Sequence, residues 1–454
     1  MVATEDRPWE RLAELLEEGD RELVLSYLEA LPTADVARAI SRLPVEAQSA
    51  LLTQLDPGEA ADLVDHFVDV QAASMIELLE PETAAAILDE LPSADQADLL
   101  CELEDEQAEA ILQAMSPEEA EGARALSAYE HDVAGGLMLA EFLTFRRDAA
   151  VADVLHDLGE SAEKYRDYDV QYAYVVGDRE RLVGVLRLRD LLLARRSTPI
   201  EELMIADPLT VLDTAPLEEL DDFFDHHHFL AVPVVDAAGA IVGVVRRNAV
   251  EEALGERGAS DYRKSQGIVG GEELRTMPLL LRSRRRLSWL CVNVLLNIGS
   301  VTIIAMHQDT LAAVIALTVF LPIISDMSGC SGNQAVAVSM RELTLGLVSP
   351  REVLRVWGKE AAVGVVNGVA LGVLVAAVAW VWSWSPYLGL VVGVAMMVNT
   401  IIAVSIGGTI PLILKRFNLD PALASGPILT TVTDMSGFLL VLGLASSMLD
   451  KLVG

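Results

Sequence analysis

The distribution of apolar and polar residues along the chain changes near residue 288. From there onward, apolar residues dominate five long segments, namely Ser288–Met306, Leu311–Met340, Ala361–Trp382, Tyr387–Leu414 and Ala422–Leu449. Each segment has about the 20 residues that a helix needs to cross the hydrocarbon core of a bilayer. No charged residue occurs from Ala361 to Leu414, whereas a helix of a soluble protein keeps a polar face. The pattern therefore predicts five transmembrane helices.

The first 130 residues show short apolar runs at helical spacing, as in Leu12, Leu15 and Leu16. Prolines separate the runs, at positions 32, 44, 57, 81, 92 and 117. Proline is favoured at the first position of a helix and cannot continue one, so each proline marks a helix boundary. The region is therefore predicted to form an all-helical superhelix.

Residues 141–255 contain an internal repeat of βα units. The segments Ala173–Leu192 and Ala231–Val250 both predict strand, turn, strand and helix in that order. Equivalent positions lie 59 residues apart, as Val175 and Val234 do, and as Gly184 and Gly243 do. A polar stretch then leads to the first apolar segment, and it is either a solvated linker or a connector between regulatory and membrane parts.

Charge separates the same two parts of the chain. Residues 1–281 carry 60 acidic and 22 basic side chains, a net charge of −38, whereas residues 282–454 carry 8 and 11, a net charge of +3. Such an acidic region disfavours nucleic acid as a partner and suits a domain that attracts cations. Acidic residues that serve only solubility would give the same charge.

The three cysteines lack the spacing of a metal site or a disulfide, which fits a reducing compartment. The start of the chain lacks a secretory signal pattern.

Basic residues alternate between the loops of the apolar half. They precede the first segment and occur between the second and third and between the fourth and fifth, whereas the opposite loops contain no lysine or arginine. By the positive-inside rule, the N-terminal half is expected in the cytoplasm and the C-terminus outside. The expected localisation is multi-pass in the cell membrane.

Two carboxylates interrupt the apolar segments, each within a DMSG sequence. Asp434 lies about a dozen residues into the fifth segment and Asp326 is similarly placed in the second, so both are expected near the bilayer midplane. Acids at that depth usually face a bundle interior or an aqueous path. The alternatives are a structural acid bonded to a neighbouring helix or, for Asp326, a break in its own helix.

The residues around these acids suggest a hard cation. Hydroxyls and small residues surround both carboxylates, without the His or Cys ligands that softer metals prefer. Mg²⁺ keeps its waters and is usually bound through one or two carboxylates, which a pair of subunits would supply, although monovalent cations remain open. The expected pore ligands are Asp434, Asp326, Thr430, Thr431 and Asn333.

The repeat of residues 141–255 resembles a tandem pair of CBS domains, which often bind adenine nucleotides such as ATP. In CBS repeats a hydroxyl residue and an Asp three residues later often hold the ribose. This chain keeps Asp190 but has Arg187 and Arg246 at the hydroxyl positions. Two roles of the pair stay open, namely nucleotide binding at Asp190 and a purely mechanical dimerising role.

A metal site at Asp225–His228 is disfavoured because adjacent side chains point in different directions.

Three motifs extend the resemblance over nearly the whole chain, namely YEHDVAGGLM (Tyr129–Met138), SGNQAVAVSMREL (Ser331–Leu343) and DPALASGPILTTVTDMSG (Asp420–Gly437). They resemble the MgtE magnesium channel and transporter family. The resemblance implies a homodimer with a pore between the subunits, lined by the second and fifth membrane helices, in which Asp434 holds hydrated Mg²⁺. It also implies closure by cytosolic Mg²⁺ at acids matched here by Asp95, Glu252 and Asp261.

The fold expected from these observations is multidomain. It comprises an all-α superhelical N-domain (1–130), an α/β tandem CBS pair (131–255), a connecting helix (256–287) and an α-helical membrane domain with five transmembrane helices (288–454).

Three functions fit the sequence. The first is a Mg²⁺ channel or transporter. The second is a transporter of Co²⁺ or Mn²⁺, or a Na⁺-coupled exchanger, because Asp326 and Cys330 stand where the family commonly has Gly and Asn. The third is a non-transporting sensor in the membrane. An enzyme is not expected, because no nucleophile–base pair, phosphate loop or closed set of metal ligands occurs.

Overall fold

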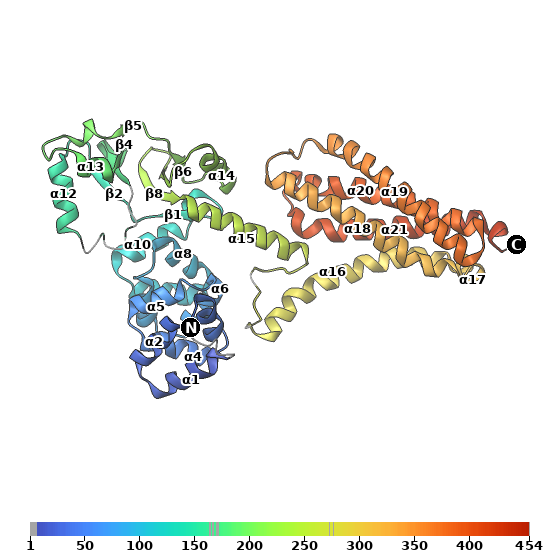
Figure 1. Cartoon of the computed structure of the whole chain (residues 1–454), viewed down its shortest axis with the longest axis horizontal. Helices are drawn as coiled ribbons and strands as arrows, with labels where there is room; N and C mark the ends of the chain where they lie inside the picture. Colours follow the sequence, from blue (N-terminus) through green and yellow to red (C-terminus); the bar gives the residue numbers. More distant parts are fainter. Residues whose placement is uncertain are drawn as a thin grey trace. The chain divides into compact units, whose positions relative to one another are not determined.

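A computed structural model describes residues 7–453, except 163–164, 166–167, 169–171, 272 and 276. The chain divides into two compact units, Met1–Glu256 and Arg257–Gly454. The division falls inside helix α15 (Arg247–Ser265). Figure 1 shows the elements of both units in sequence colours.

Short helices follow one another through the first part of the N-terminal unit. Their bounds are α1 (Pro8–Glu18), α2 (Arg21–Ala30), α3 (Thr33–Ile40), α4 (Val45–Gln54), α5 (Pro57–Val64), α6 (Asp69–Ile76), α7 (Pro81–Leu88), α8 (Ser93–Glu102), α9 (Asp105–Ala114) and α10 (Pro117–Leu126). Pro57, Pro81 and Pro117 occupy the first helical position, where a missing N–H leaves no bond unmade. The other three prolines of the series directly precede α3, α4 and α8.

From α4 onward, each helix packs on the second helix that follows it, α4 on α6, α5 on α7, and so on to α8 on α10. One hydrophobic core runs through the array from Leu12 to Ala123. This regular stacking confirms the predicted all-α superhelix.

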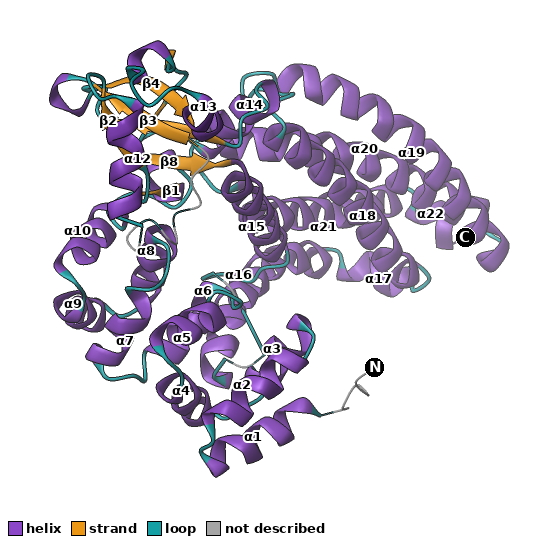
Figure 2. Cartoon of the chain, turned by 60° about the vertical axis from the view of Figure 1, so that its left-hand side comes forward, coloured by secondary structure: helices purple, strands orange, loops and turns teal. Residues whose placement is uncertain are grey.

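Two four-stranded sheets follow in the same unit, and Figure 2 shows them as the strand-bearing part of the chain. The strands are β1 (Met138–Leu139), β2 (Leu143–Arg146), β3 (Tyr172–Val176), β4 (Leu182–Arg187), β5 (Ile205–Ala206), β6 (Val211–Leu212), β7 (Ala231–Val235) and β8 (Ile241–Arg246). Their orders are β2-β3-β4-β5 and β1-β8-β7-β6. The accompanying helices are α11 (Ala134–Leu137), α12 (Val151–Glu160), α13 (Leu188–Leu193) and α14 (Leu217–His226), with short 3₁₀ turns at Asp178–Glu180 and Ile200–Glu202.

The sequence repeat is also a structural repeat. Val175 pairs with Gly184 across β3 and β4, and Val234 pairs with Gly243 across β7 and β8. In both hairpins the register shifts directly after the valine. Both glycines also meet a methionine, because an added Cβ would lie 2.5 Å from a sulfur atom at either position. The predicted α/β pair is confirmed.

The second unit is helical in its described part. After the end of α15, its helices are α16 (Leu279–Met306), α17 (Gln308–Ala313), α18 (Leu317–Thr344), α19 (Val353–Ser383), α20 (Pro386–Arg416), α21 (Pro421–Ser447) and α22 (Leu449–Val453). The predicted turn between two apolar helices lies at Trp384, with φ at +55°, and at Ser385, which caps α20 by accepting a hydrogen bond from the Leu388 N–H. Because Pro386 starts α20 directly, the turn between the two long helices is short.

Four of the described helices, α16, α19, α20 and α21, are long and apolar enough to cross a membrane. Helix α18 has comparable length but carries the polar sequence DMSGCSGNQ and does not reach the same hydropathy. A multi-pass membrane unit is therefore supported, while the count of five spanning helices stays a prediction. Helix α18 continues without interruption through Asp326, which excludes the alternative that this acid marks a helix break.

Candidate functional site

Asp434 lies about midway along α21 and is half-buried. The Ser325 hydroxyl of α18 donates a hydrogen bond to Asp434 Oδ1. The carboxylate is therefore held at the packing interface of α18 and α21, with part of its surface open. A charge-assisted hydrogen bond of this kind orients a carboxylate without neutralising it.

A buried asparagine fixes the turn of α21 that carries Asp434. Asn399 of α20 is fully buried, and its Nδ2 donates to the Thr433 carbonyl oxygen at 3.1 Å. The Ser436 hydroxyl donates to Asn399 Oδ1 at 2.5 Å. These bonds bracket Asp434 on both sides along the helix. The sequence analysis did not select Ser325 or Asn399 as site residues, although a lone amide within the uncharged Ala361–Leu414 stretch is a recognisable signal.

Glycines allow the three helices to approach closely at this level. A Cβ on Gly437 would lie 2.8 Å from Asn399 Nδ2, so a larger residue would displace the amide. A Cβ on Gly407 of α20 would lie 2.3 Å from the Gly332 carbonyl oxygen of α18. Small residues at such crossings bring helix backbones into contact, as in other membrane bundles.

Asp326 and Asn333, the two predicted pore residues of α18, lie with Cys330 on one exposed face of that helix. Asp326, Cys330 and Asn333 are spaced four and three residues apart, so they share a face, and all three are exposed. Asp326 makes no hydrogen bond or ion pair with the described part of the chain. The adjacent residues Ser325 and Asp326 therefore point in different directions. Ser325 is bonded to Asp434 of α21, whereas Asp326 lies on the exposed face of α18.

The two predicted threonines lie one turn before Asp434. Thr430 is exposed, and its hydroxyl donates to the Pro427 carbonyl oxygen at 3.1 Å. The Thr431 hydroxyl donates to the same oxygen at 2.7 Å. Because their protons are used within the helix, their lone pairs remain available to a cation or its waters. Thr430 and Asp434, four residues apart, lie on the same side of α21.

A separate cavity of about 620 Å³ in the N-terminal unit gathers acidic side chains. Its acidic lining residues are Asp65, Asp69, Asp95, Asp98, Glu252 and Glu256, from both the helical array and the start of α15. Two of the predicted sensor acids, Asp95 and Glu252, are thus brought together. No group of three or more His, Cys, Asp or Glu side chains in the described part is already arranged as a metal-ligand set.

The electrostatics of this cavity favour a bound cation. Burial and the neighbouring charges of Asp65 and Asp98 raise the pKa of Asp95 to about 7. A carboxyl group with such a pKa is partly protonated at neutral pH, because ionising it adds to an already negative cavity. A divalent cation would relieve this repulsion by displacing the proton.

The third predicted sensor acid, Asp261, does not line that cavity. It lies near the end of α15, where burial raises its pKa while the charges of Lys264 and Arg257 oppose the shift. Lys264 Nζ forms an ion pair at 3.0 Å with Asp420 Oδ2, and Asp420 caps the start of α21. Asp261 therefore belongs to a mixed-charge cluster, unlike Asp95.

A second cavity, of about 270 Å³, lies in the two-sheet region. Phe142, Tyr172 and Tyr174 line it together with Arg246 and Arg247. The guanidinium of Arg247 is occupied, because it donates to backbone carbonyls at the end of α14 and just beyond it. Asp190, the predicted ribose ligand, lies in α13 next to Arg189 and does not line this cavity.

The chain was compared with known families and proteins. The model of the MgtE divalent cation transporter matches residues 321–444, that of the MgtE intracellular N domain matches residues 31–132, and that of the CBS domain matches residues 134–197 and 200–256. The magnesium transporter MgtE of Thermus thermophilus is 32% identical over 445 residues, which cover 97% of this chain and 98% of that protein. MgtE of Bacillus subtilis is 29% identical over 335 residues, 74% of this chain and 73% of that protein.

One solved structure is the cytosolic domain of the Mg²⁺ channel MgtE in complex with ATP. It is 32% identical to this chain with a TM-score of 0.49, and it matches 53% of this chain and 98% of its own length.

The unit with four apolar helices holds an acid where α21 packs on α18, and the N-terminal unit combines a helical array with an α/β pair. Together with the matching family model, these features define a multi-pass divalent-cation transporter. The chain belongs to the MgtE family. Membership confirms the expectation of an ion transporter rather than an enzyme.

Proposed function

We propose that the chain conducts Mg²⁺ across the cell membrane along a path lined by α18 and α21, with Asp434 as its central ligand. The observation that carries this proposal is the half-buried carboxylate of Asp434. Ser325 donates a hydrogen bond to it, and Asn399 bonds Thr433 and Ser436 on either side of it along α21. Mg²⁺ is the ion named for the transporters of Thermus thermophilus and Bacillus subtilis that this chain resembles.

The chemistry of the path suits a hydrated cation. A single carboxylate with hydroxyl neighbours gives too few ligands to strip Mg²⁺ of its waters, and Mg²⁺ usually retains several of them when it binds. Thr430, Thr431 and Asn333 would contact those waters through oxygen atoms. Asp326 would add a second carboxylate on the exposed face of α18.

The exposed face of α18 also supports a homodimer. The exposed face with Asp326, Cys330 and Asn333 is more polar than lipid tolerates, so we expect a second copy of the chain to cover it. Two copies of Asp434 would then form a ring of charge across the path. In this arrangement the N-terminal unit, residues 1–130 and 131–255, lies in the cytoplasm and the C-terminus outside.

Cytosolic Mg²⁺ would regulate the path. The acidic cavity with Asp95 and Glu252 is the proposed sensor, because a divalent cation would offset the burial and the charge repulsion that raise the pKa of Asp95. The connecting segment, residues 256–287 with Asp261, would transmit the bound state to the membrane helices. An adenine nucleotide in the cavity with Tyr172 and Tyr174 is a further regulatory ligand to test, since aromatic rings suit a base.

Mg²⁺ uptake into liposomes that contain the purified full-length protein tests the proposal. Asp434→Ala is expected to reduce uptake to that of protein-free liposomes. Asp450→Ala, an exposed acid beyond α21, is the matched control and should retain uptake. Wild-type-like uptake by Asp434→Ala would contradict the proposal.

The same liposomes separate the other two functions. Uptake of Co²⁺ or Mn²⁺ that Mg²⁺ does not inhibit, or uptake that requires a Na⁺ gradient, would favour a transporter of another ion. Absence of any flux, together with a cation-dependent change of shape, would favour a membrane sensor.

A further inference from the structure

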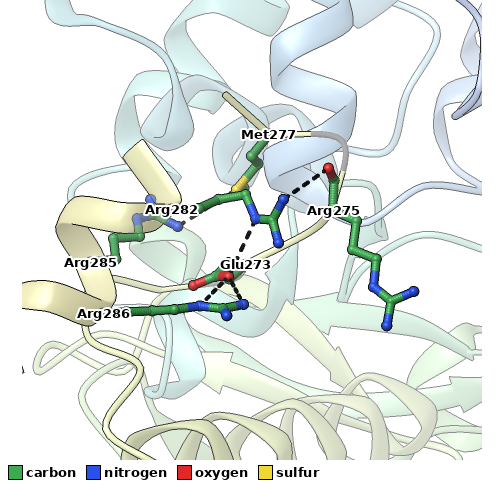
Figure 3. Close-up of polar contacts among 6 residues, drawn as sticks. All are labelled: Glu273, Arg275, Met277, Arg282, Arg285 and Arg286. Carbon is green, nitrogen blue, oxygen red and sulfur yellow. Dashed lines mark hydrogen bonds and ion pairs between the residues drawn. The ribbon is translucent and has the colours of Figure 1, made fainter. Parts of the chain in front are cut away.

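Glu273 and Arg275, which lie between α15 and α16, contact one face of α16 (Figure 3). The Glu273 side chain is only 3% exposed, and its Oε1 accepts hydrogen bonds from Arg282 Nε at 3.4 Å and from Arg286 Nε at 2.9 Å. Arg282 also donates to the Arg275 carbonyl oxygen at 3.3 Å. Trp289, one turn beyond Arg286, packs so closely on Gly267 that a Cβ there would lie 2.1 Å from its ring. Glu273 thus holds Arg282 and Arg286 in internal ion pairs, and the Arg286 side chain stays 53% exposed.

Arg284 lies on the opposite face of α16. It is two residues from both Arg282 and Arg286, and two residues on a helix project roughly 200° apart. Arg284 is exposed and makes no hydrogen bond or ion pair with the residues that the structure describes. Leu280 and Leu287, four residues before it and three after it, share its face and are 81% and 55% exposed. The Arg284 guanidinium, which has no ion-pair partner among the described residues, therefore lies between the exposed side chains of Leu280 and Leu287.

The position of Arg284 along the helix matches the level of lipid phosphates. The segment from Leu287 to Met306 lacks charged residues and contains 20 residues, so it spans about 30 Å, the thickness of a hydrocarbon core. Leu287 is then at the edge of the acyl chains, and Arg284 is about one turn outside it.

We propose that the start of α16 binds an anionic phospholipid, with the lipid phosphate on Arg284 and an acyl chain against Leu287. Glu273 engages Arg282 and Arg286 on the opposite face of α16, so the site depends on Arg284. A soluble phosphate would use Arg284 but would leave the exposed Leu287 without a role, so Leu287 favours a lipid. This inference depends on insertion of α16 into a membrane and not on which ion passes.

The test measures phosphatidylglycerol bound to the full-length protein in neutral detergent by native mass spectrometry, with phosphatidylcholine as the uncharged comparison. Arg284→Gln is expected to weaken phosphatidylglycerol binding roughly fivefold, since one arginine near a membrane surface contributes about 1 kcal/mol. Arg351→Gln, which removes an exposed arginine from the loop before α19, is the matched control and should have no effect. Equal binding by the two variants would overturn the site.

Two further arms test the source of the phosphate and the role of Glu273. Inorganic phosphate at a thousandfold excess should leave phosphatidylglycerol bound, and displacement of the lipid by phosphate would indicate a soluble-anion site instead. Glu273→Gln should leave phosphatidylglycerol binding unchanged, because Arg282 and Arg286 lie on the face of α16 opposite Arg284. Tighter binding by Glu273→Gln would show that the lipid is held on the other face and would contradict the assignment to Arg284.

Discussion

Asp434 in the membrane unit and Asp95 in the N-terminal unit are both partly buried acids, but their surroundings differ. Asp434 has a neutral polar setting, with a hydroxyl from Ser325 and no other acid bonded to it. Asp95 shares a cavity with five other acidic side chains, and burial and their charge raise its pKa to about 7. The first acid is held in a fixed orientation by hydrogen bonds, whereas the second is destabilised by its neighbours.

This difference corresponds to two tasks for one cation. An ion that passes must bind and leave again, so a single carboxylate in a neutral frame gives moderate affinity. A regulatory site must respond to concentration, and a crowded set of acids gains most when a cation neutralises it. The comparison therefore supports the proposal that Asp434 serves conduction and the cavity of Asp95 serves sensing.

The largest expected effect separates the sensor from the path. Neutralising Asp95 and Glu252 together, as Asp95→Asn with Glu252→Gln, should raise the internal Mg²⁺ concentration that half-inhibits uptake by roughly tenfold or more, within the usual range of allosteric coupling. Maximal uptake should stay unchanged. Asp105→Asn with Glu106→Gln removes two exposed acids of α9 outside the cavity and should leave inhibition unaltered. Equal inhibition of both double variants would place the sensor elsewhere.

The second prediction concerns the polar frame of Asp434. Asn399→Leu leaves the Ser436 hydroxyl and the Thr433 carbonyl without their buried partner, and the loss should destabilise the membrane unit by about 1–3 kcal/mol. Thermal unfolding of the full-length protein in detergent measures this change. Asn297→Leu, at an exposed position of α16, is the control. An unchanged midpoint for Asn399→Leu would show that the bracket contributes nothing.

The third prediction is a pH dependence of stability in the absence of divalent cations. Because the pKa of Asp95 is raised in the folded state, the native protein holds a proton that the unfolded chain has released between about pH 4 and pH 7. The free energy of unfolding should therefore fall as pH rises through this range, on the order of 2 kcal/mol after solvent screening. Asp95→Asn should flatten the profile, and added Mg²⁺ should restore stability above pH 7. A rise in wild-type stability from pH 5 to pH 7 would contradict the assigned environment.

The smallest effect is expected at Asp326. Replacing it with glycine removes a carboxylate from the exposed face of α18 but leaves the Ser325 bond to Asp434 in place. The ratio of Mg²⁺ to Co²⁺ uptake should change by about fivefold, equivalent to about 1 kcal/mol, with little loss of Mg²⁺ uptake. An unchanged ratio would mean that Asp326 lies outside the path.

The sequence predicted those features that depend on local pattern or internal repetition. Prolines placed the helices of the superhelix, and the 59-residue repeat predicted equivalent hairpins in which Val175 pairs with Gly184 and Val234 with Gly243. Asp434 was selected as a pore ligand from its depth in an apolar segment, and that role stays a prediction. The proline and carboxylate signals are each contained in a few dozen residues, and the repeat extends only from residue 173 to residue 250.

The features that were missed depend on contacts between distant segments. Ser325 and Asp434 are 109 positions apart, and Asn399 and Thr433 are 34 apart, so no local pattern links them. Glu273 reads as one more acid of a polar connector, and only the fold places its carboxylate against Arg282 and Arg286. Similarly, the helical pattern of α15 did not separate Asp261 from the acids of the cavity, because the cavity is formed by three-dimensional packing.

The most direct test of the division between path and sensor is Mg²⁺ uptake measured against internal Mg²⁺ in one series of liposomes. The wild type should take up Mg²⁺ at low internal Mg²⁺ and stop at high internal Mg²⁺. Asp434→Asn should show no uptake at any internal concentration, whereas Asp95→Asn with Glu252→Gln should continue uptake at concentrations that stop the wild type. Uptake by Asp434→Asn with normal inhibition would contradict the assignment of the path to Asp434.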